Sequence, residues 1–332
     1  MGNKMTGPAA ANIAAAGPPH QKTHIPHHPQ RKPQPTSWLG RAWQGSGPGY
    51  MFLLPWFIGF FGLTLGPAIV SLYLSFTDFD LLRAPNWVGM ANYVRIATSD
   101  PKFAASMGVT LFFVLFSVPL KLAFALGVAV VLNRGIRGLP VYRAVFYLPS
   151  LLGTSVAIAV LWRQLFASDG LVNSILAEFG IEGPSWISHP SYSIWTLIIL
   201  SIWQFGSPMI IFLAGLRQIP GDMYEAASLD GASKWRQFFK ITLPLLTPVI
   251  FFNAVVQTID AFKAFTPAFI ISGGTGGPIN STLFYTLYLY QEAFGFFRMG
   301  YASALAWVLV VIIALFTAFS FLTARFWVHY DD

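Results

Sequence analysis

The sequence predicts an all-α, polytopic membrane protein with six transmembrane helices. Of its 332 residues, 55% are hydrophobic and only 10% are charged, whereas an ordinary soluble domain carries roughly 25% charged residues. The apolar residues also form continuous runs instead of alternating with polar ones. Continuous runs favour membrane-spanning helices over a β-barrel, whose strands would alternate.

Six apolar runs are long enough to cross the hydrocarbon layer, which takes about 20 residues in a helix. They cover residues 50–76, 104–132, 145–166, 192–216, 245–271 and 302–324. Residues 50–325 are therefore expected to form one transmembrane domain, followed by a short C-terminal segment at 326–332. An even number of spans places both ends of the chain on the same side of the bilayer.

The Lys and Arg residues indicate which side that is, since cytoplasmic connections carry an excess of them. Thirteen lie in the N-terminal tail, in the connections after the second and fourth spans, and at the C-terminal end, against four in the other connections. The thirteen are Lys4, Lys22, Arg31, Lys32, Arg41, Arg134, Arg137, Arg143, Arg217, Lys234, Arg236, Lys240 and Arg325, and the four are Arg83, Arg95, Lys102 and Arg298. Both termini are therefore expected in the cytoplasm. The net charge of +7 then reflects topology, and no nucleic-acid motif accompanies it.

Residues 1–49 differ from the rest of the chain, because they are rich in Pro, Ala and Gly and contain no acidic residue. Such a segment cannot bury a core and is expected to be a disordered basic tail, with the first span acting as an uncleaved targeting signal. His20, His24, His27 and His28 could bind a metal or belong to a solvated tail near anionic lipid. A flexible segment fixes no ligand geometry, which favours the second interpretation. With no Cys in the chain, there are no disulfides, thiolate metal sites or thiol nucleophiles. No metal site is predicted.

Motifs for catalysis are missing from the sequence, which contains no GxxxxGK[ST], HExxH or GxSxG pattern. The Gly-rich stretch SGGTGGP at 272–278 lacks the lysine of a phosphate-binding loop, so a turn between the fifth and sixth spans is the favoured interpretation. His189 lies alone in a connection and is expected to be structural. No catalytic residue is predicted, and no cofactor bound by this chain.

The connection at 217–244, between the fourth and fifth spans, is unusually polar. Pro220 suits the first position of a helix, GDMYEAASL follows it, Asp230 and Gly231 interrupt the helix, and ASKWRQFFK forms a second one. Apolar or small residues repeat at helical spacing on both segments, at Met223, Ala226 and Ala227 and again at Trp235, Phe238 and Phe239. The pattern predicts a helix-turn-helix outside the bilayer. Periodicity alone fits an amphipathic hairpin resting on the membrane as well as a docking element.

The string YEAASLDGASKWRQFFKITLPLLTP resembles the EAA loop of permease subunits of ATP-binding-cassette (ABC) importers. The matching residues are Glu225, Ala226, Ala227, Asp230, Gly231, Ala232, Phe238, Ile241, Leu243 and Pro244. WVGMANYVRI, LNRGIRGLPVYRAVFYLPS, IWQFGSPMIIFLAGLRQIP and SGGTGGP also resemble the sugar-importer branch, in its maltose-type or glycerol-phosphate-type permeases. The resemblance covers roughly residues 50–325.

This resemblance implies a type I ABC importer permease in the bacterial plasma (inner) membrane. Glu225, Ala226, Ala227, Asp230 and Gly231 would couple the permease to a cytoplasmic ATPase, which binds ATP and Mg. It also implies a second permease subunit, two ATPase subunits and an extracytoplasmic solute-binding protein that delivers a carbohydrate.

Span five carries a row of polar residues, Asn253, Gln257, Asp260 and Lys263, at intervals of four, three and three. This spacing places them on one helical face. Polar groups at bilayer depth usually face a protein interior or a watery cavity. The row therefore predicts a sugar pathway, although Asp260 and Lys263 could instead neutralise each other or bond to neighbouring spans.

Two other functions stay open on the residues alone. A stand-alone secondary transporter would be indicated by inverted internal repeats, and the sequence contains no convincing one. A membrane scaffold without transport would leave the polar row of span five unexplained. No motif selects one sugar, polyol or sugar phosphate over another.

Overall fold

The structure is a computed structural model that describes residues 52–135, 137–153 and 155–329. The predicted disordered tail at 1–49, with its four histidines, and the last three residues lie outside the described part. The described residues up to Phe60 belong to a first unit, and the described residues from Phe61 onward belong to a second. The regular secondary structure of the described residues is helical, apart from one isolated β-bridge between Thr77 and Trp87.

The helical elements of the described residues follow one another from η1 to α16. In chain order they are η1 (Phe60–Leu65), α2 (Gly66–Leu74), α3 (Ala91–Thr98), α4 (Pro101–Leu132), α5 (Leu139–Leu152), α6 (Val156–Leu165), α7 (Leu171–Glu178), α8 (Pro190–Trp203), α9 (Gly206–Leu216), α10 (Gly221–Leu229), α11 (Lys234–Gln237), η2 (Phe238–Thr242), α12 (Leu243–Leu245), α13 (Thr247–Phe262), α14 (Thr266–Ile271), η3 (Pro278–Asn280), α15 (Tyr285–Tyr290), η4 (Gln291–Gly295) and α16 (Met299–Ala324).

Four helical segments among the described residues are long and apolar enough to cross a membrane unbroken: Phe52–Leu74, Pro101–Leu132, Thr247–Ile271 and Met299–Ala324. Two further segments are bent pairs, α5 with α6 at 94° and α8 with α9 at 42°. Counting each pair as one span gives six, at the positions that the hydropathy predicts. The third and fourth spans are therefore broken helices.

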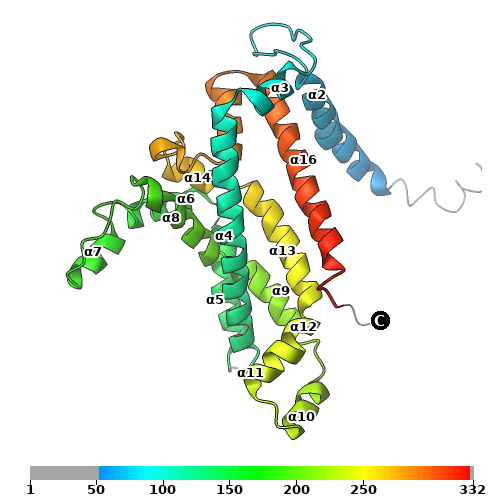
Figure 1. The fold of residues 1–332 in the computed structure, drawn as a ribbon, viewed down its shortest axis with the longest axis vertical. Helices are drawn as coiled ribbons and strands as arrows, with labels where there is room; N and C mark the ends of the chain where they lie inside the picture. The colour runs from blue at the N-terminus through cyan, green and yellow to red at the C-terminus, as the bar shows by residue number, and fades with distance from the viewer. Residues whose placement is uncertain (1–51, 136, 154, 330–332) are drawn as a thin grey trace, which may run out of the picture. The chain divides into compact units, whose positions relative to one another are not determined.

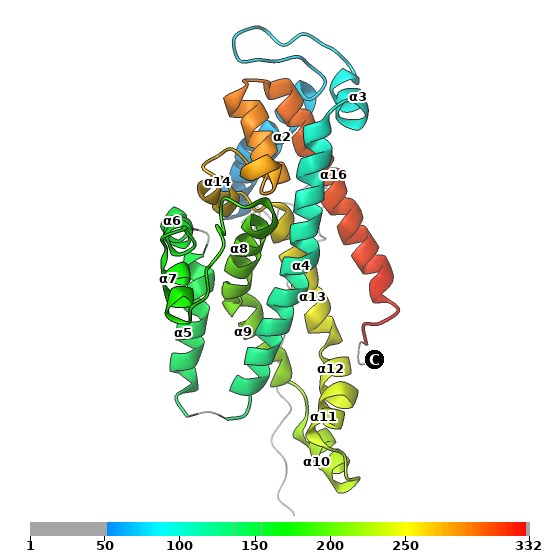
Figure 2. The same ribbon diagram turned by 60° about the vertical axis from the view of Figure 1, so that its left-hand side comes forward.

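The long helix α4 is the centre of the second unit. It packs against α8, α9, α13 and α15, and both views show it running alongside α9 and α13 (Figures 1 and 2). Ala125 and Ala129 on α4 are fully buried, as is Met209 on α9. Small side chains let helix backbones approach closely, which is the usual basis of helix association in membranes.

The segment between spans five and six is more than a connection. Its Gly-rich part is the predicted turn, because Gly273, Gly274, Gly276 and Gly277 all have positive φ, a conformation that glycine adopts without strain. The helix α15 that follows is packed into the bundle. The backbone N–H of Tyr285, a fully buried residue, donates a hydrogen bond of 2.9 Å to Thr110 Oγ1 on α4.

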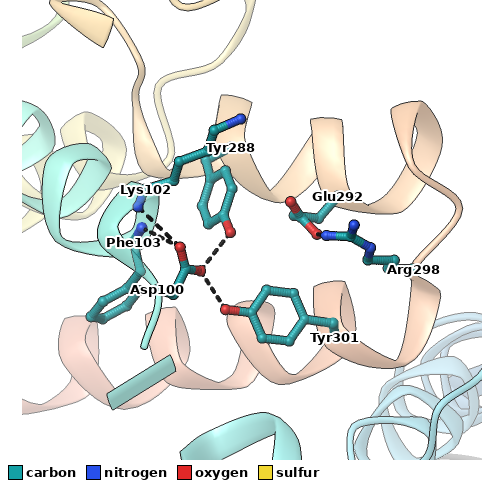
Figure 3. A network of polar contacts seen from close by, with 7 residues as sticks. All are labelled: Asp100, Lys102, Phe103, Tyr288, Glu292, Arg298 and Tyr301. Atoms are coloured by element: carbon teal, nitrogen blue, oxygen red, sulfur yellow. Dashed lines mark hydrogen bonds and ion pairs between the residues drawn. The ribbon is translucent and has the colours of Figure 1, made fainter. Parts of the chain in front are cut away.

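A polar network joins the beginning of α4 to α15 and α16 (Figure 3). Asp100 caps α4, and its Oδ1 accepts hydrogen bonds from the backbone N–H groups of Lys102 (3.0 Å) and Phe103 (3.1 Å). Its Oδ2 accepts hydrogen bonds from the hydroxyl groups of Tyr288 (2.5 Å) and Tyr301. Burial alone would raise the pKa of Asp100, but these four hydrogen bonds together hold it below the ordinary value.

An ion pair continues the same network (Figure 3). Glu292 on η4 is buried, and its Oε2 lies 3.0 Å from Nη1 of Arg298. The backbone N–H of Arg298 also donates to the carbonyl oxygen of Glu292 at 2.8 Å. Buried charges are stable when they are both paired and hydrogen-bonded, so this end of α4, α15 and α16 is held by directional contacts.

Candidate functional site

The polar connection after the fourth span folds as a helical hairpin. Its first arm is α10, and Pro220 is the residue directly before the helix, one position earlier than the sequence predicts. Gly231 follows the C-cap residue Asp230 with φ of +76°. The backbone N–H of Ala232 then donates to the carbonyl of Ala227 at 2.9 Å, which closes the helix end in the manner typical of a glycine cap.

The second arm differs from the prediction, which ended it as a separate short helix. Ser233 caps it by accepting a hydrogen bond from the backbone N–H of Arg236 at 3.4 Å. The arm then continues through α11, the π-helical η2 and α12 into α13, so the chain is helical from the hairpin into the fifth span, with only Leu246 between α12 and α13. Pro244 has no N–H for a helical hydrogen bond and its ring crowds the preceding turn, and the widened turn of η2 directly before it lets the helix continue.

Two side-chain hydrogen bonds hold the arms together. Gln237 is 3% exposed, and its Nε2 donates to Ser228 Oγ at 2.8 Å and to the carbonyl of Ala232 at 3.2 Å. The hydroxyl groups of Tyr224 and Thr242 lie 2.9 Å apart. The hairpin is therefore a rigid unit with a fixed angle between its arms.

The tip of this hairpin is an exposed surface that mixes apolar and acidic groups. Glu225 and Ala226 are exposed. Leu229 is 90% exposed and Trp235 is 74% exposed, with the Trp235 ring stacked on Phe239 at 6.0 Å. α10 and α11 lie at the opposite end of the second unit from α3 (Figures 1 and 2). Large apolar side chains at such a tip are typical of a surface that binds a protein or a membrane.

A cavity of about 520 Å³ lies inside the second unit. Its walls come from α4, from both broken helix pairs and from span five. Its polar lining consists of Lys121, Ser150, Ser201, Gln204, Ser207, Gln257, Asp260, Lys263 and Thr266. Three of the four polar residues predicted on span five, Gln257, Asp260 and Lys263, thus line one cavity.

Asn253, the fourth member of the row, lies outside this lining. It is 1% exposed, and its Nδ2 donates to the carbonyl of Val249 at 3.1 Å, while its Oδ1 is buried without a hydrogen-bond partner among the described residues. It lies one helical turn before Gln257, on the hairpin side. The polar row therefore extends beyond the cavity toward the hairpin.

The bends of the two broken helix pairs meet at the cavity. Gln204, at the bend between α8 and α9, donates through Nε2 to the carbonyl of Gly153 at the end of α5, at 3.1 Å. Ser150 Oγ donates to the carbonyl of Gln204 at 2.9 Å and accepts from the backbone N–H of Ser207 at 2.9 Å. A Cβ atom at Gly153 would lie 2.3 Å from the side chain of Gln204, so glycine is required for this approach. Backbone groups freed at helix breaks are satisfied here by side chains, as membrane helices require.

The sequence alone did not identify Lys121, Ser150 and Gln204 as members of this site. Lys121 could have been found, because a single cation in a long apolar run is a functional signal in itself. Ser150 and Gln204 carry no such signal, since their place in the cavity depends on the two helix bends.

The fold and the site define an all-helical, polytopic membrane protein with a polar cavity and an exposed helical hairpin. Residues 48–328 match the family described as "Binding-protein-dependent transport system inner membrane component", and the chain belongs to this family. It is the transmembrane permease of a binding-protein-dependent ABC sugar importer. The ATPase, which binds the ATP, is a separate component in this family.

Similar proteins agree with this assignment. The chain is 54% identical to the probable ABC transporter permease protein YesP of Bacillus subtilis, over 86% of this chain and 92% of that protein. It is 33% identical to the lactose transport system permease protein LacF of Rhizobium radiobacter, over 83% and 94% of the two chains. Among solved structures, a bacterial alginate ABC transporter in complex with an alginate-bound periplasmic protein has the same fold, with a TM-score of 0.73, 21% identity and coverage of 86% and 96%.

Proposed function

We propose that this chain pairs with a second permease subunit and two cytoplasmic ATPase subunits, and receives a carbohydrate from an extracytoplasmic solute-binding protein. Both termini would lie in the cytoplasm of a bacterium, as the distribution of Lys and Arg indicates. The solved alginate transporter supports such an assembly, since its title describes a complex with a periplasmic protein.

The hairpin at 217–244 is the surface that docks on the ATPase in this proposal. Glu225, Ala226 and Ala227 form the contact arm, and Asp230 and Gly231 set the turn. The support is the rigid hairpin itself, with its exposed apolar tip and its helical continuation into span five. A docking element must be stiff to transmit a movement, and the hydrogen bond of Gln237 to Ser228 supplies that stiffness.

The cavity is the carbohydrate pathway in this proposal, with Gln257, Asp260 and Lys263 in contact with the cargo. The observation that carries it is the convergence of these residues with the bends of two broken helix pairs. Discontinuous membrane helices recur at transport sites. Asn253 is the next polar group on the same face. It is buried, and its Oδ1 has no hydrogen-bond partner among the described residues, so it would meet a cargo hydroxyl only after the surrounding helices move.

The experiment compares two readouts in proteoliposomes that contain the complete complex. Gln257→Leu should lower carbohydrate uptake at least tenfold, while stimulation of the ATPase by the binding protein survives. Gly231→Val should lower both. Thr258→Val, next to Gln257 but outside the cavity lining, is the matched control. Unchanged uptake in Gln257→Leu would remove the pathway from this cavity.

A further inference from the structure

Three charged side chains line the cavity, and their charges do not cancel. Lys121 comes from α4, whereas Asp260 and Lys263 come from span five. Asp260 Oδ1 lies 3.2 Å from Lys263 Nζ, so this carboxylate already has a cation one helical turn away. With one carboxylate and two ammonium groups, the lining carries a surplus of one positive charge.

The surplus positive charge of the lining is the ammonium group of Lys121. Its side chain makes no hydrogen bond or ion pair with any residue that the structure describes, and its electrostatic interaction is with Asp260 across the cavity. A charged group at bilayer depth is costly and normally faces a partner or a watery cavity. Among the residues that the structure describes, the only carboxylate lining the cavity is that of Asp260, which is shared with Lys263. The ammonium group of Lys121 is therefore available for an anion.

The remaining lining suits a sugar. Gln257, Ser201 and Gln204 provide amide and hydroxyl groups, which both donate and accept hydrogen bonds as carbohydrate hydroxyls do. Phe265 and Phe284 add aromatic rings to the wall. The cavity therefore combines one unpaired cation with polar and aromatic groups in a space of about 520 Å³.

We propose that the cargo of this cavity is a carbohydrate that carries a carboxylate, and that Lys121 pairs with that carboxylate. The proposal rests on the function proposed above. A neutral sugar would displace water from the ammonium group of Lys121 without supplying a counter-ion, whereas a carboxylate supplies one negative charge for the one surplus positive charge. A phosphate carries about −1.5 to −2 at neutral pH, more than the surplus of the lining.

The test uses the complete complex with its binding protein in proteoliposomes. The probes are matched pairs of disaccharides that share one sugar residue and differ in the other, which is either a neutral sugar or its uronate: glucose or glucuronate, mannose or mannuronate, galactose or galacturonate. The measured quantity is the ratio of uronate to neutral uptake within a pair, so that differences in delivery by the binding protein cancel when a variant is compared with the unmodified complex.

Lys121→Gln should lower this ratio about tenfold or more, because a hydrogen bond to a charged group in a desolvated site is worth roughly 1.5 to 3 kcal/mol. Lys121→Arg should keep most of it. Lys102→Gln, at the beginning of the same helix and outside the cavity lining, should leave it unchanged. Removal of a charge from a membrane span favours insertion, and stimulation of the ATPase reports that the variant is assembled.

Three outcomes would overturn the inference: no uronate is transported, Lys121→Gln leaves the ratio unchanged, or phosphorylated disaccharides are preferred to the uronates. A failure of the underlying function is distinguishable from these. In that case Gln257→Leu would leave the uptake of every probe unchanged, charged or neutral.

Discussion

The side-chain amide of Gln237 donates a hydrogen bond of 2.8 Å to the hydroxyl group of Ser228, and this contact joins the two arms of the hairpin. Gln237 lies on the arm that continues into span five, and Ser228 lies on α10. The amide also donates to the carbonyl of Ala232 in the turn. One buried side chain thus fixes both the turn and the separation of the arms.

Gln237→Leu should therefore weaken coupling. The substitution removes both hydrogen bonds, each of which contributes about 0.5 to 1.5 kcal/mol. Uptake and ATPase stimulation should fall together, several-fold, in proteoliposomes. Gln218→Leu, at an exposed glutamine that precedes the first arm α10 and bonds to neither arm, should leave both readouts unchanged. A loss of uptake with normal ATPase stimulation would contradict the role of Gln237 in coupling.

Gly231 should tolerate substitution according to backbone conformation and not according to size. Its φ is +76°, and nothing lies within 4 Å of a Cβ built there, so the cost of a side chain is conformational. We expect uptake to decrease in the order Gly231→Asn, Gly231→Ala, Gly231→Val, because Asn adopts the left-handed region more readily and β-branched residues least readily. Gly221→Ala, where φ is not positive and space is equally open, is the control. Equal uptake in all three Gly231 variants would show that the turn does not need this conformation.

Orientation can be tested by single cysteines, since the chain has none of its own. Cysteines at Asn86, Ser188 and Thr275 should react with an impermeant thiol reagent in intact cells, and cysteines at Asn133 and Ser233 should react only after the membrane is opened. All five positions are exposed. Asn133 is preferable to the nearby Gly138, whose φ of +78° would strain a cysteine. Labelling of Ser233→Cys from outside would reverse the topology.

The hydrogen bonds of Asp100 should make the stability of the folded protein depend on pH in the acidic range. The pKa of this carboxyl in the folded state lies below its ordinary value of 3.8. The ionised carboxylate therefore stabilises the folded state fully at pH values above 3.8. This stabilisation is lost as the pH falls from there through the folded-state pKa. Asp100→Asn should lower the thermal unfolding temperature of the purified complex at pH 7 and flatten its dependence between about pH 2 and pH 5. Tyr301→Phe should act in the same direction and less strongly. A pH profile that is identical in Asp100→Asn and in the unmodified protein would contradict this role.

Hydropathy predicts the spans well and their bends poorly. The predicted second and sixth spans agree with α4 and α16 to within a few residues. The third was predicted as one helix, yet it turns by 94° between α5 and α6. Bending depends on local contacts such as Ser155, whose Oγ accepts a hydrogen bond from the backbone N–H of Ile158 at 3.3 Å and so starts a new helix. An average over a window of residues contains no such information.

The prediction of the candidate site from sequence has the same limit. Gln257, Asp260 and Lys263 could be grouped from sequence because helical spacing relates them directly. Gln204 and Lys121 join them from other helices, and no periodicity relates residues that far apart in the chain. The hairpin was predictable in outline because Gly231 marks its turn, while the continuation of its second arm into α13 depends on the packing of the bundle.

The nearly continuous helical segment that joins the hairpin to the cavity has a thermodynamic consequence. From Lys234 to Phe262 the chain is helical apart from Leu246, and at 1.5 Å per residue it extends roughly 40 Å. In the proposed function, the ATPase binds at the hairpin end of this segment and the carbohydrate at the cavity end, and two such binding events are linked reciprocally. If bound carbohydrate changes the affinity of the hairpin for the ATPase by some factor, the bound ATPase changes the affinity of the cavity for carbohydrate by the same factor. The coupling free energy would therefore be measurable from either end of this helical segment.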